Sequence, residues 1–400
     1  MEIPVLYLGW WADTAAALAR HGCATTFIAG PADAGRAPRM VVVPDPERLD
    51  DVVSALLREG VDPAAFDVVI SEHEECLVPA AVLAAAYGRP GMAVGTAVAL
   101  RDKAVQKARV RAAGIPVAGC HTIVRIEELA DSDLPCVVKP LAGCSTKLTF
   151  AVHNATDRVD AVRAVTASGT AGPWLVEEFM SGVEYHVDGV VRGGEVLFAG
   201  VSKYLQNVIE IQRGGLVGSV AVDPSSPLTA RARELCAAAL RAIGHADGVF
   251  HLEFFDQGDR LAFSECAGRI GGGMVLETTR AKFGVDLYDE WVAAVLGRPS
   301  GLVESVDPRP YGWVQLTAPA GRVLALPSPE EVRARPGVVA LQTAVSVGDT
   351  VPDPASASNA RAGRVTMVGE TEDGLASDMR ALVAWFHSQV RTDRTIARAA

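Results

Sequence analysis

Two glutamates stand in otherwise apolar, strand-like segments on either side of a tight turn. Glu253 lies within His251–Phe255, Glu265 ends Leu261–Glu265, and the turn Asp256–Asp259 joins the two segments. An ionised carboxylate in such a strand is costly unless something compensates it, and two neighbouring carboxylates also repel each other. A shared divalent cation would remove both costs, and oxygen-only ligands favour Mg²⁺ or Mn²⁺. The sequence therefore predicts a metal site at Glu253 and Glu265; the alternative is an edge strand with both side chains in solvent.

A glycine-rich segment with one arginine follows the second glutamate directly. It runs Gly268-Arg269-Ile270-Gly271-Gly272-Gly273. Glycines let the backbone approach a ligand closely, and the planar Arg269 guanidinium suits carboxylate or phosphate oxygens. A plain turn with a solvated arginine is the alternative for the segment taken alone.

A lysine and a loop of small residues form a second candidate site for an anion. Lys139 ends the apolar run Pro135–Val138 and precedes the loop Ala142–Lys147. Exposed backbone N–H groups in such a loop form an anion-binding concavity, and Lys139 would neutralise the bound charge. The spacing GxxxxGK[ST] of the common phosphate-binding loop is absent.

Two more acids flank a bend that contains a glycine. Glu177 and Glu184 lie on either side of Phe179–Gly182. Such a bend could present a backbone edge and an apolar wall to a purine ring, with a carboxylate for ribose hydroxyls. Surface acids around an ordinary turn are the alternative.

The first hundred residues are expected to position part of this chemistry on a parallel sheet. Apolar runs at Ile3–Leu8 and Asp67–Ile70 alternate with helical patterns at Ala12–His21 and at Leu49–Glu59, which Gly60 ends. This βαβ pattern predicts a sheet with helices on both faces and ligands at the carboxyl ends of the strands. Those ends carry Gly9-Trp10-Trp11 and Ser71-Glu72-His73-Glu74-Glu75, without a GxGxxG motif for a dinucleotide.

The rest of the chain carries further helix and turn signals, and it becomes β-rich from residue 301. Arg101–Ala113 is predicted to be one cationic helix, and the Gly193-Gly194 pair predicts a hairpin turn. From residue 301 the chain reads as a small β-rich appendage closed by a helix over Leu375–Arg391. Its expected strands are 312–317, 322–325, 339–343 and 364–368.

Composition excludes several classes of protein. The 400 residues carry 48 acidic and 37 basic side chains, a net charge of −11 that argues against a general nucleic-acid binder. No apolar run is long enough to span a membrane, and the N-terminus lacks the basic start of a signal peptide. Seven scattered cysteines without a CxxC pair fit a reducing compartment. We therefore expect a cytoplasmic protein that binds neither nucleic acid nor membrane.

Taken together and in order, these motifs resemble the ATP-grasp superfamily, and within it the carboxylate–amine ligases such as bacterial L-amino-acid ligases. The resemblance implies an α/β fold of α+β lobes. Its expected parts are an N-terminal parallel α/β domain (1–97), a linker helix and central ATP-binding lobe (98–182), a C-terminal core with the metal site (183–300) and a β-rich extension (301–400). Val347–Val351 and Arg364–Gly369 resemble that subgroup's extension.

The resemblance also implies roles for individual residues. Glu253 and Glu265 match the two magnesium acids, and Arg269 matches an arginine facing the transferred phosphate. The residues that match ATP contacts are Lys103, Lys139, Lys203, the lid Gly143–Lys147 with Ser145 and Thr146, Glu177 and Met180 beside the adenine, and Glu184 at the ribose. Two positions depart from the pattern: Ala267 replaces a usual metal-binding Asn, and Lys147 a usual lid Gly. Lys147 either reaches a phosphate or points outward.

The implied reaction joins a carboxylate, expected to be an amino acid, to an amine through an acyl phosphate, with ADP and phosphate as products. The side chains expected to line the substrate site are Trp10, Glu72, Glu74, Glu210 and Arg213, with Trp11 and His73 beside them. His73 and His251 are candidate bases for the amine, although a lone histidine in an apolar strand is more often a core residue. Two alternatives stay open: a purine-pathway-like transfer of formate or bicarbonate, or loading onto a carrier protein, and a nucleotide-binding regulator. Expected partners are small molecules, and a homodimer is expected for the class.

Overall fold

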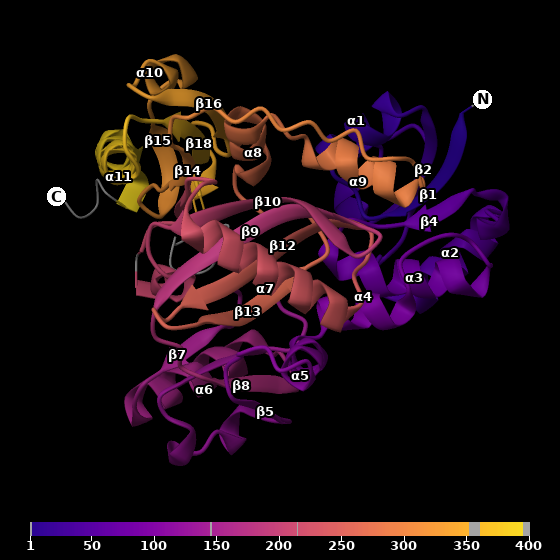
Figure 1. The fold of residues 1–400 in the computed structure, drawn as a ribbon, viewed down its shortest axis with the longest axis horizontal. Helices are drawn as coiled ribbons and strands as arrows, with labels where there is room; N and C mark the ends of the chain where they lie inside the picture. The colour runs from indigo at the N-terminus through magenta and orange to yellow at the C-terminus, as the bar shows by residue number, and fades with distance from the viewer. Residues whose placement is uncertain (1, 145, 214, 352–360, 395–400) are drawn as a thin grey trace.

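The computed structural model describes residues 2–144, 146–213, 215–351 and 361–394. Within these residues the strands form a four-stranded parallel sheet, a four-stranded antiparallel sheet, an eight-stranded antiparallel sheet and a small three-stranded one. Figure 1 shows the parallel sheet and the smaller antiparallel sheet on different sides of the large one. The predicted α/β class is confirmed. No helix among the described residues has the length and apolar character needed to cross a membrane.

The parallel sheet forms at the N-terminus, as predicted. Its strands, in the order β3-β2-β1-β4, are β1 (Ile3–Leu8), β2 (Cys23–Ala29), β3 (Met40–Val42) and β4 (Val68–Ile70). The helices that follow β1, β3 and β4 are α1 (Ala12–Arg20), α2 (Leu49–Glu59) and α3 (Leu77–Ala86). Gly60 ends α2 in the left-handed region at φ 66°, as the sequence predicts. Glu72 and Glu74 follow β4 at its carboxyl end.

The helix predicted over 101–113 is α5 (Lys103–Ala112), and a separate helix, α4 (Val94–Arg101), directly precedes it. Asp102 separates them because its backbone is extended and its side chain accepts hydrogen bonds from the backbone N–H groups of Ala104 and Val105. Asp102 is therefore the N-cap of α5. This break places Lys103 in the first turn of α5 and Lys107 one turn later on the same face.

The smaller antiparallel sheet follows α5. Its strands, in the order β5-β8-β6-β7, are β5 (Cys120–Ile123), β6 (Cys136–Pro140), β7 (Phe150–Val152) and β8 (Trp174–Glu178). Helix α6 (Ala155–Ser168) packs against this sheet through Ala161 and Val165. The loop between β6 and β7 contains the predicted lid.

The large antiparallel sheet is the centre of the molecule. Its strands, in the order β13-β12-β9-β10-β11-β14-β18-β16, are β9 (Val183–Arg192), β10 (Glu195–Tyr204), β11 (Gly218–Ala221), β12 (Gly248–Asp256), β13 (Leu261–Ala267), β14 (Tyr311–Leu316), β16 (Val338–Thr343) and β18 (Gly363–Val368). Gly193 and Gly194 form the predicted hairpin turn between β9 and β10.

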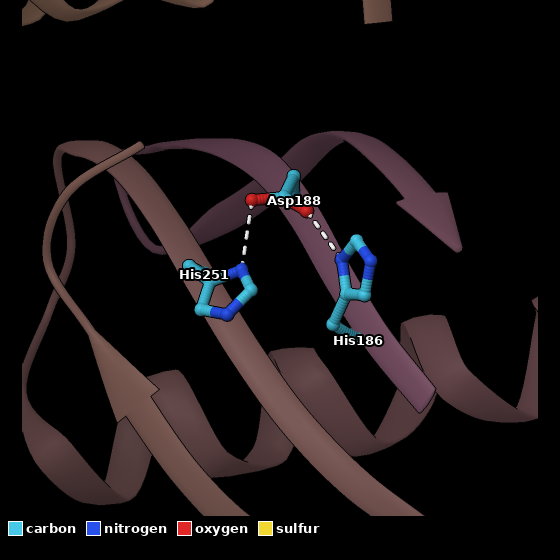
Figure 2. A group of neighbouring side chains, drawn as sticks. All are labelled: His186, Asp188 and His251. Atoms are coloured by element: carbon cyan, nitrogen blue, oxygen red, sulfur yellow. Dashed lines mark hydrogen bonds and ion pairs between the residues drawn. The ribbon is translucent and has the colours of Figure 1, made fainter. Parts of the chain in front are cut away.

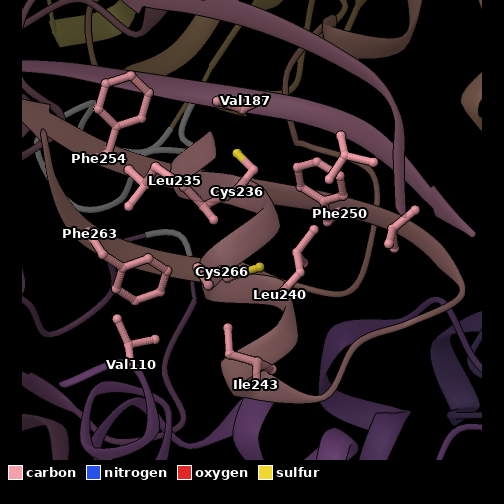
Figure 3. Packing of buried hydrophobic residues seen from close by; sticks show 14 of the residues in the cluster. Val110, Val187, Leu235, Cys236, Leu240, Ile243, Phe250, Phe254, Phe263 and Cys266 are labelled. Atoms are coloured by element: carbon pink, nitrogen blue, oxygen red, sulfur yellow. The ribbon is translucent and has the colours of Figure 1, made fainter. Parts of the chain in front are cut away.

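The two faces of this sheet have different chemistry because side chains alternate along each strand. Phe250, Leu252 and Phe254 of β12 pack beneath helix α7 (Pro227–Ile243), as Figure 3 shows for Phe250 and Phe254. The intervening His251 and Glu253 face the opposite side. The apolar face thereby forms the core, and the other face is free to carry polar groups.

Part of the β-rich extension continues the large sheet, and its strands β15 (Gly321–Ala325), β17 (Thr350–Val351) and β19 (Arg391–Thr392) form the small three-stranded sheet. β14 pairs with β11, and β18 pairs with β14, each in antiparallel register. Helix α11 (Glu372–Gln389) covers one face of these strands through Leu375, Met379 and Phe386. The remaining helices are α8 (Val275–Phe283), α9 (Leu287–Val295) and α10 (Pro329–Arg333). The domain boundary at residue 300 stays a prediction.

Candidate active site

A cavity of about 290 Å³ is lined by side chains of both antiparallel sheets. The smaller sheet contributes residues of β6 and β8, and the large sheet contributes residues of β9, β10, β12 and β13 together with β14 and β18. The predicted site residues that line it are Glu74, Lys103, Lys139, Gly143, Thr146, Glu177, Met180, Glu184, Glu210, Glu253, Glu265 and Arg269. The tertiary structure thus collects residues that lie up to 195 positions apart in the chain.

Glu253 and Glu265 lie directly opposite each other on β12 and β13. Both line the cavity, so they do not point away from it into solvent on an edge strand. Their four carboxylate oxygens, without nitrogen or sulfur ligands from the same pair, are the donor set that Mg²⁺ or Mn²⁺ prefers. The pair therefore fits the divalent cation that the sequence predicts.

Two lysines hold Glu265 in its ionised form. Lys103 Nζ lies 3.0 Å from Glu265 Oε1, and Lys139 Nζ lies 3.6 Å from Oε2. Burial raises the pKa of Glu265, but the charges of Lys103 and Lys139 outweigh burial and lower that pKa to about 2. Lys103 also donates to the carbonyl oxygen of Gly143 over 2.7 Å, which ties helix α5 to the lid loop.

Glu177 is a buried acid between two lysines. Its carboxylate lies 2.9 Å from Lys139 Nζ and 2.7 Å from Lys107 Nζ. Burial alone would raise the pKa of Glu177, yet Lys107 and Lys139 keep it below its usual value. Glu177 therefore positions Lys139 beside the cavity, and contact of the Glu177 side chain with a nucleotide stays a prediction.

Glu184 lines the same cavity as Glu253 and Glu265. Its Oε2 accepts a hydrogen bond of 2.6 Å from the backbone N–H of Val208. Burial and the nearby Glu253 carboxylate raise the pKa of Glu184. Glu184, Glu253 and Glu265 thus share one cavity, and a bound cation would relieve the repulsion among their carboxylates.

Glu253 lies beside a hydrogen-bond network formed by Asp188, His186 and His251. Asp188 accepts from His186 Nδ1 at 2.7 Å and from His251 Nδ1 at 2.9 Å, as Figure 2 shows. The remaining ring nitrogen of His186 bonds Ser219 Oγ at 2.8 Å, and that of His251 lies 3.5 Å from Glu253 Oε1. Although burial opposes it, Asp188 raises the pKa of His251 to about 10. His251 is therefore protonated near neutral pH, and its cationic ring faces Glu253.

His186, Asp188 and His251 are also close enough together to share a metal ion. Every ring nitrogen and carboxylate oxygen that faces another member of this group already takes part in a hydrogen bond at 2.7–2.9 Å. The geometry is that of a hydrogen-bond network that orients His251. His251, which the sequence analysis treats as a candidate base or a core residue, is partly buried, belongs to this network and lines the cavity.

Strand β10 presents Tyr204 rather than Lys203 to the cavity. Tyr204 donates its hydroxyl hydrogen to Glu253 Oε1 over 2.7 Å. Lys203 is exposed and does not line the cavity, because neighbouring side chains of a strand point to opposite faces. The structure therefore gives no support to the predicted phosphate contact of Lys203.

Arg269 is held by the acids that follow β4. Arg269 Nε donates to Glu74 Oε2 over 2.6 Å, and Arg101 Nη1 lies 3.7 Å from the other Glu74 oxygen. Glu72 is buried behind the cavity wall and accepts from the backbone N–H of Ile270 over 3.3 Å. The N-terminal sheet thus orients the glycine-rich segment.

Several predicted residues lie elsewhere. Trp10 does not line the cavity, and the Arg36 guanidinium lies 5.1 Å from the centre of its ring. Lys147 is exposed and likewise does not line the cavity, which favours the outward orientation. Ser145 and the side chain of Arg213 lie outside the described part of the structure.

Sequence reasoning missed residues whose signals were present. Lys107 follows Lys103 by one helical turn, and His186 and Asp188 follow the predicted Glu184 at every second position of one strand. Such polar repeats within apolar segments mark a face that lines a site. The wall that the extension contributes, namely Trp313, Gln315 and Arg364, had no comparable signal.

Comparison with known proteins adds two kinds of evidence. Residues 314–391 match the family described as L-amino acid ligase C-terminal domain 2. An L-arginine-specific L-amino acid ligase of Bacillus subtilis is 26% identical over 323 residues, which cover 77% of this chain and 76% of that protein. A formate-dependent phosphoribosylglycinamide formyltransferase of Anaeromyxobacter dehalogenans is 30% identical over 280 residues, covering 64% of this chain and 69% of that protein.

Solved structures share the whole fold. The L-amino acid ligase of Bacillus licheniformis superposes with a TM-score of 0.79 at 19% identity, covering 98% of this chain and 99% of that one. The carboxyaminoimidazole ribonucleotide synthase of Aspergillus clavatus, solved with ATP, gives a TM-score of 0.73 at 17% identity, covering 96% and 99%. At this identity the likeness concerns the fold alone.

Proposed function

Because the chain belongs to the ATP-grasp family of ATP-dependent carboxylate–amine ligases, we propose that it joins the carboxylate of an amino acid to an amine through an acyl phosphate. The products would be an amide or dipeptide, ADP and phosphate. The single observation that carries the proposal is the Glu253–Glu265 pair, which faces a cavity that also contains Lys103 and Lys139. The amino-acid substrate is supported by the family match of the extension and by the Bacillus subtilis relative.

Four charged groups of the cavity bind ATP or its cation in this proposal. Lys103 and Lys139 bind phosphate oxygens of ATP, and the lid loop with Gly143 and Thr146 covers them. Glu253 and Glu265 hold Mg²⁺ or Mn²⁺, which when bound supplies positive charge against the charge that develops on the phosphates.

The chemistry then proceeds in two displacements. The substrate carboxylate attacks the γ-phosphorus, the bond to the β-phosphate oxygen breaks, and ADP leaves. The amine next attacks the acyl carbon, loses a proton, and phosphate leaves. Arg269, oriented by Glu74, stabilises the oxyanion or the departing phosphate. Because an acyl phosphate hydrolyses readily, the lid must exclude water at this stage.

A panel of amino-acid pairs incubated with ATP and MgCl₂ tests the proposal. We expect ADP release that requires both an acid and an amine, and a condensed product in the mass spectrum. ATP binding without such release from any pair would contradict it.

The second candidate function is transfer of formate onto an amine. The formyltransferase relative, at 30% identity, favours it specifically. Formate and bicarbonate therefore belong in the acid panel, and ADP release with either of them in place of an amino acid would select this alternative.

The metal assignment gives a sharper prediction. Glu265→Ala should reduce ADP release at least ~1,000-fold, because it removes half of the carboxylate pair that would hold the cation, and the cation would supply the positive charge that offsets the charge on the phosphates. Binding of Mn²⁺, followed by electron paramagnetic resonance, should weaken in parallel. Glu195→Ala, at an exposed position of β10, is the matched control. A Glu265→Ala protein that retains near-wild-type turnover would refute the assignment.

A further inference from the structure

The C-terminal extension contributes a polar wall to the cavity. On β14 and β18, Trp313 pairs with Thr366 and Gln315 pairs with Arg364, so these side chains share one face of the sheet. Alternate residues such as Val314 belong to the core beneath α11. Trp313, Gln315 and Arg364 line the cavity, and the proposed chemistry on Glu253, Glu265 and Arg269 uses none of them.

Two donors in this wall lack acceptors among the described residues. Arg364 Nη1 donates to the carbonyl oxygen of Gly273 over 2.9 Å, whereas its Nε is buried without a hydrogen-bond partner. The indole Nε1 of Trp313 is also buried and unpartnered. A buried donor without an acceptor is unfavourable, because it has lost its hydrogen bonds to water without gaining a partner. Two such donors in one cavity wall indicate a ligand with acceptor oxygens.

The wall also carries positive charge without an acidic partner. Within the described part of the chain, no carboxylate forms an ion pair with Arg364. Burial and then the nearby Arg361 guanidinium lower the pKa of Arg364 to about 10, with Glu277 acting weakly in the opposite direction. An anion at this position would offset both unfavourable effects.

The glycine-rich segment links this wall to the reacting centre. Gly273 has φ 80°, and a Cβ atom there would lie 2.3 Å from the ring of Trp313, so the segment passes directly beneath the indole. Arg364 bonds the same glycine. Arg269 lies four residues earlier, which limits the two Cα atoms of Arg269 and Gly273 to a separation of ~14 Å.

We propose that Arg364 and Trp313 form a subsite for a carboxylate that the reaction leaves intact, namely the free carboxylate of the amine substrate. This inference rests on the proposed function. The acyl carboxylate must lie by Glu253, Glu265 and Arg269, where phosphate is transferred, so a second anion subsite at the other end of the glycine segment serves the other substrate. A guanidinium and an indole N–H match the two oxygens of a carboxylate. The amine substrate is then an amino acid or peptide rather than a simple amine.

The experiment compares L-amino acids with their α-carboxamides on wild type and Arg364→Gln. Both measurements use the full chain with MgCl₂. The first is the KM of the amine, measured by ADP release in the presence of ATP. The second is calorimetric titration, in the presence of ADP, with each L-amino acid, such as L-alanine, and with its carboxamide. Wild type should prefer the carboxylate at least ~10-fold. Arg364→Gln should raise the KM of the amino acid about 10- to 100-fold and abolish the preference, with the KM of ATP and the melting temperature nearly unchanged.

Matched variants separate binding from folding. Arg364→Lys keeps the charge and should restore part of the preference, and Arg322→Gln, at an exposed position of β15, should behave as wild type. Equal weakening of carboxylate and carboxamide by Arg364→Gln, or a wild type without preference, would overturn the subsite. Tighter binding of phosphoethanolamine than of any amino acid, lost in Arg364→Gln, would likewise reject a carboxylate in favour of a phosphate.

The two proposals fail in different ways. If the wild type releases no ADP with any pair, the proposed function is wrong. Calorimetry still tests the subsite in that case, and a preference for carboxylates that Arg364→Gln abolishes would support the subsite. Absence of binding by every amino acid in the calorimeter would overturn the subsite even if ADP release occurs with formate or bicarbonate as the acid and a simple amine.

Discussion

Glu72 is one of the buried acids whose titration near neutral pH should change the free energy of unfolding. It is 4% exposed, and burial raises its pKa from 4.5 to about 7, although Arg269 acts against this. Between these two pH values the unfolded chain has lost the proton that the folded protein retains. The folded state therefore loses stability as the pH rises from 4.5 to 7, and the loss is complete above 7.

Glu72→Gln removes this titration while its amide oxygen can still accept from the Ile270 N–H. At pH 8 the free energy of unfolding of the variant should exceed that of wild type by up to roughly 3 kcal/mol, and near pH 4.5 the two should agree within about 1 kcal/mol. Urea unfolding at several pH values measures both quantities. Glu195→Gln, at an exposed site, is the control, and a variant that is less stable than wild type at pH 8 would count against the burial argument.

At the residue scale, a charged side chain within an apolar segment was the signal that identified candidate site residues. Glu253, Glu265 and Lys139 were found in this way, and all three line the cavity. Glu177 shows the limit of the method. Its residue type is compatible with nucleotide contact, but its carboxylate forms ion pairs with Lys107 of α5 and Lys139 of β6. These lysines are far from Glu177 in the sequence.

At the element scale, the N-cap of α5 should matter for both stability and nucleotide binding. The Asp102 side chain accepts from two backbone N–H groups at 2.9 Å each. Asp102→Ala should lower the free energy of unfolding by about 1 kcal/mol. Because Lys103 and Lys107 lie on α5, the KM of ATP should rise several-fold as the helix start frays.

Asp102→Asn retains an oxygen acceptor and should recover most of both losses. Denaturant titration and steady-state kinetics on the three proteins make the comparison. If Asn is as damaging as Ala, the carboxylate charge rather than the cap is what matters at this position.

Helices and strands themselves were largely predictable because their signals are local. The glycine at the end of α2 and the pair between β9 and β10 both adopt the left-handed conformation that the sequence suggests. The helix predicted over Arg101–Ala113 forms as α5, and it begins two residues later than predicted because Asp102 is its N-cap.

At the scale of the whole molecule, the joint between β11 and β14 should decide whether the extension reaches the cavity. A Cβ atom on Gly312 would lie 2.5 Å from the carbonyl oxygen of Ser219 and 2.5 Å from Met379 Cε. Gly312→Ala should therefore force the strands apart, lower the melting temperature by several degrees and raise the KM of the amine.

Gly95→Ala is the matched substitution, because it lies in helix α4 with only an Arg109 side-chain nitrogen at 3.5 Å. It should leave the melting temperature unchanged or raise it slightly, since alanine favours a helix. Thermal unfolding followed by circular dichroism compares the two variants. A Gly312→Ala protein as stable as Gly95→Ala would show that the joint tolerates separation.

The sequence alone determined the α/β class, the order of elements and the acids, lysines and arginine whose types suit ATP-dependent ligation, because alternation, turn residues and charge within apolar strands act over short distances. Only the tertiary structure decided that Tyr204 rather than Lys203 supports Glu253, that Glu74 holds Arg269, and that Arg364 of the extension enters the same cavity. These contacts join segments separated by tens to hundreds of residues. They depend on strand pairing and on which face each strand turns inward, and neither property is recorded in any single stretch of the chain.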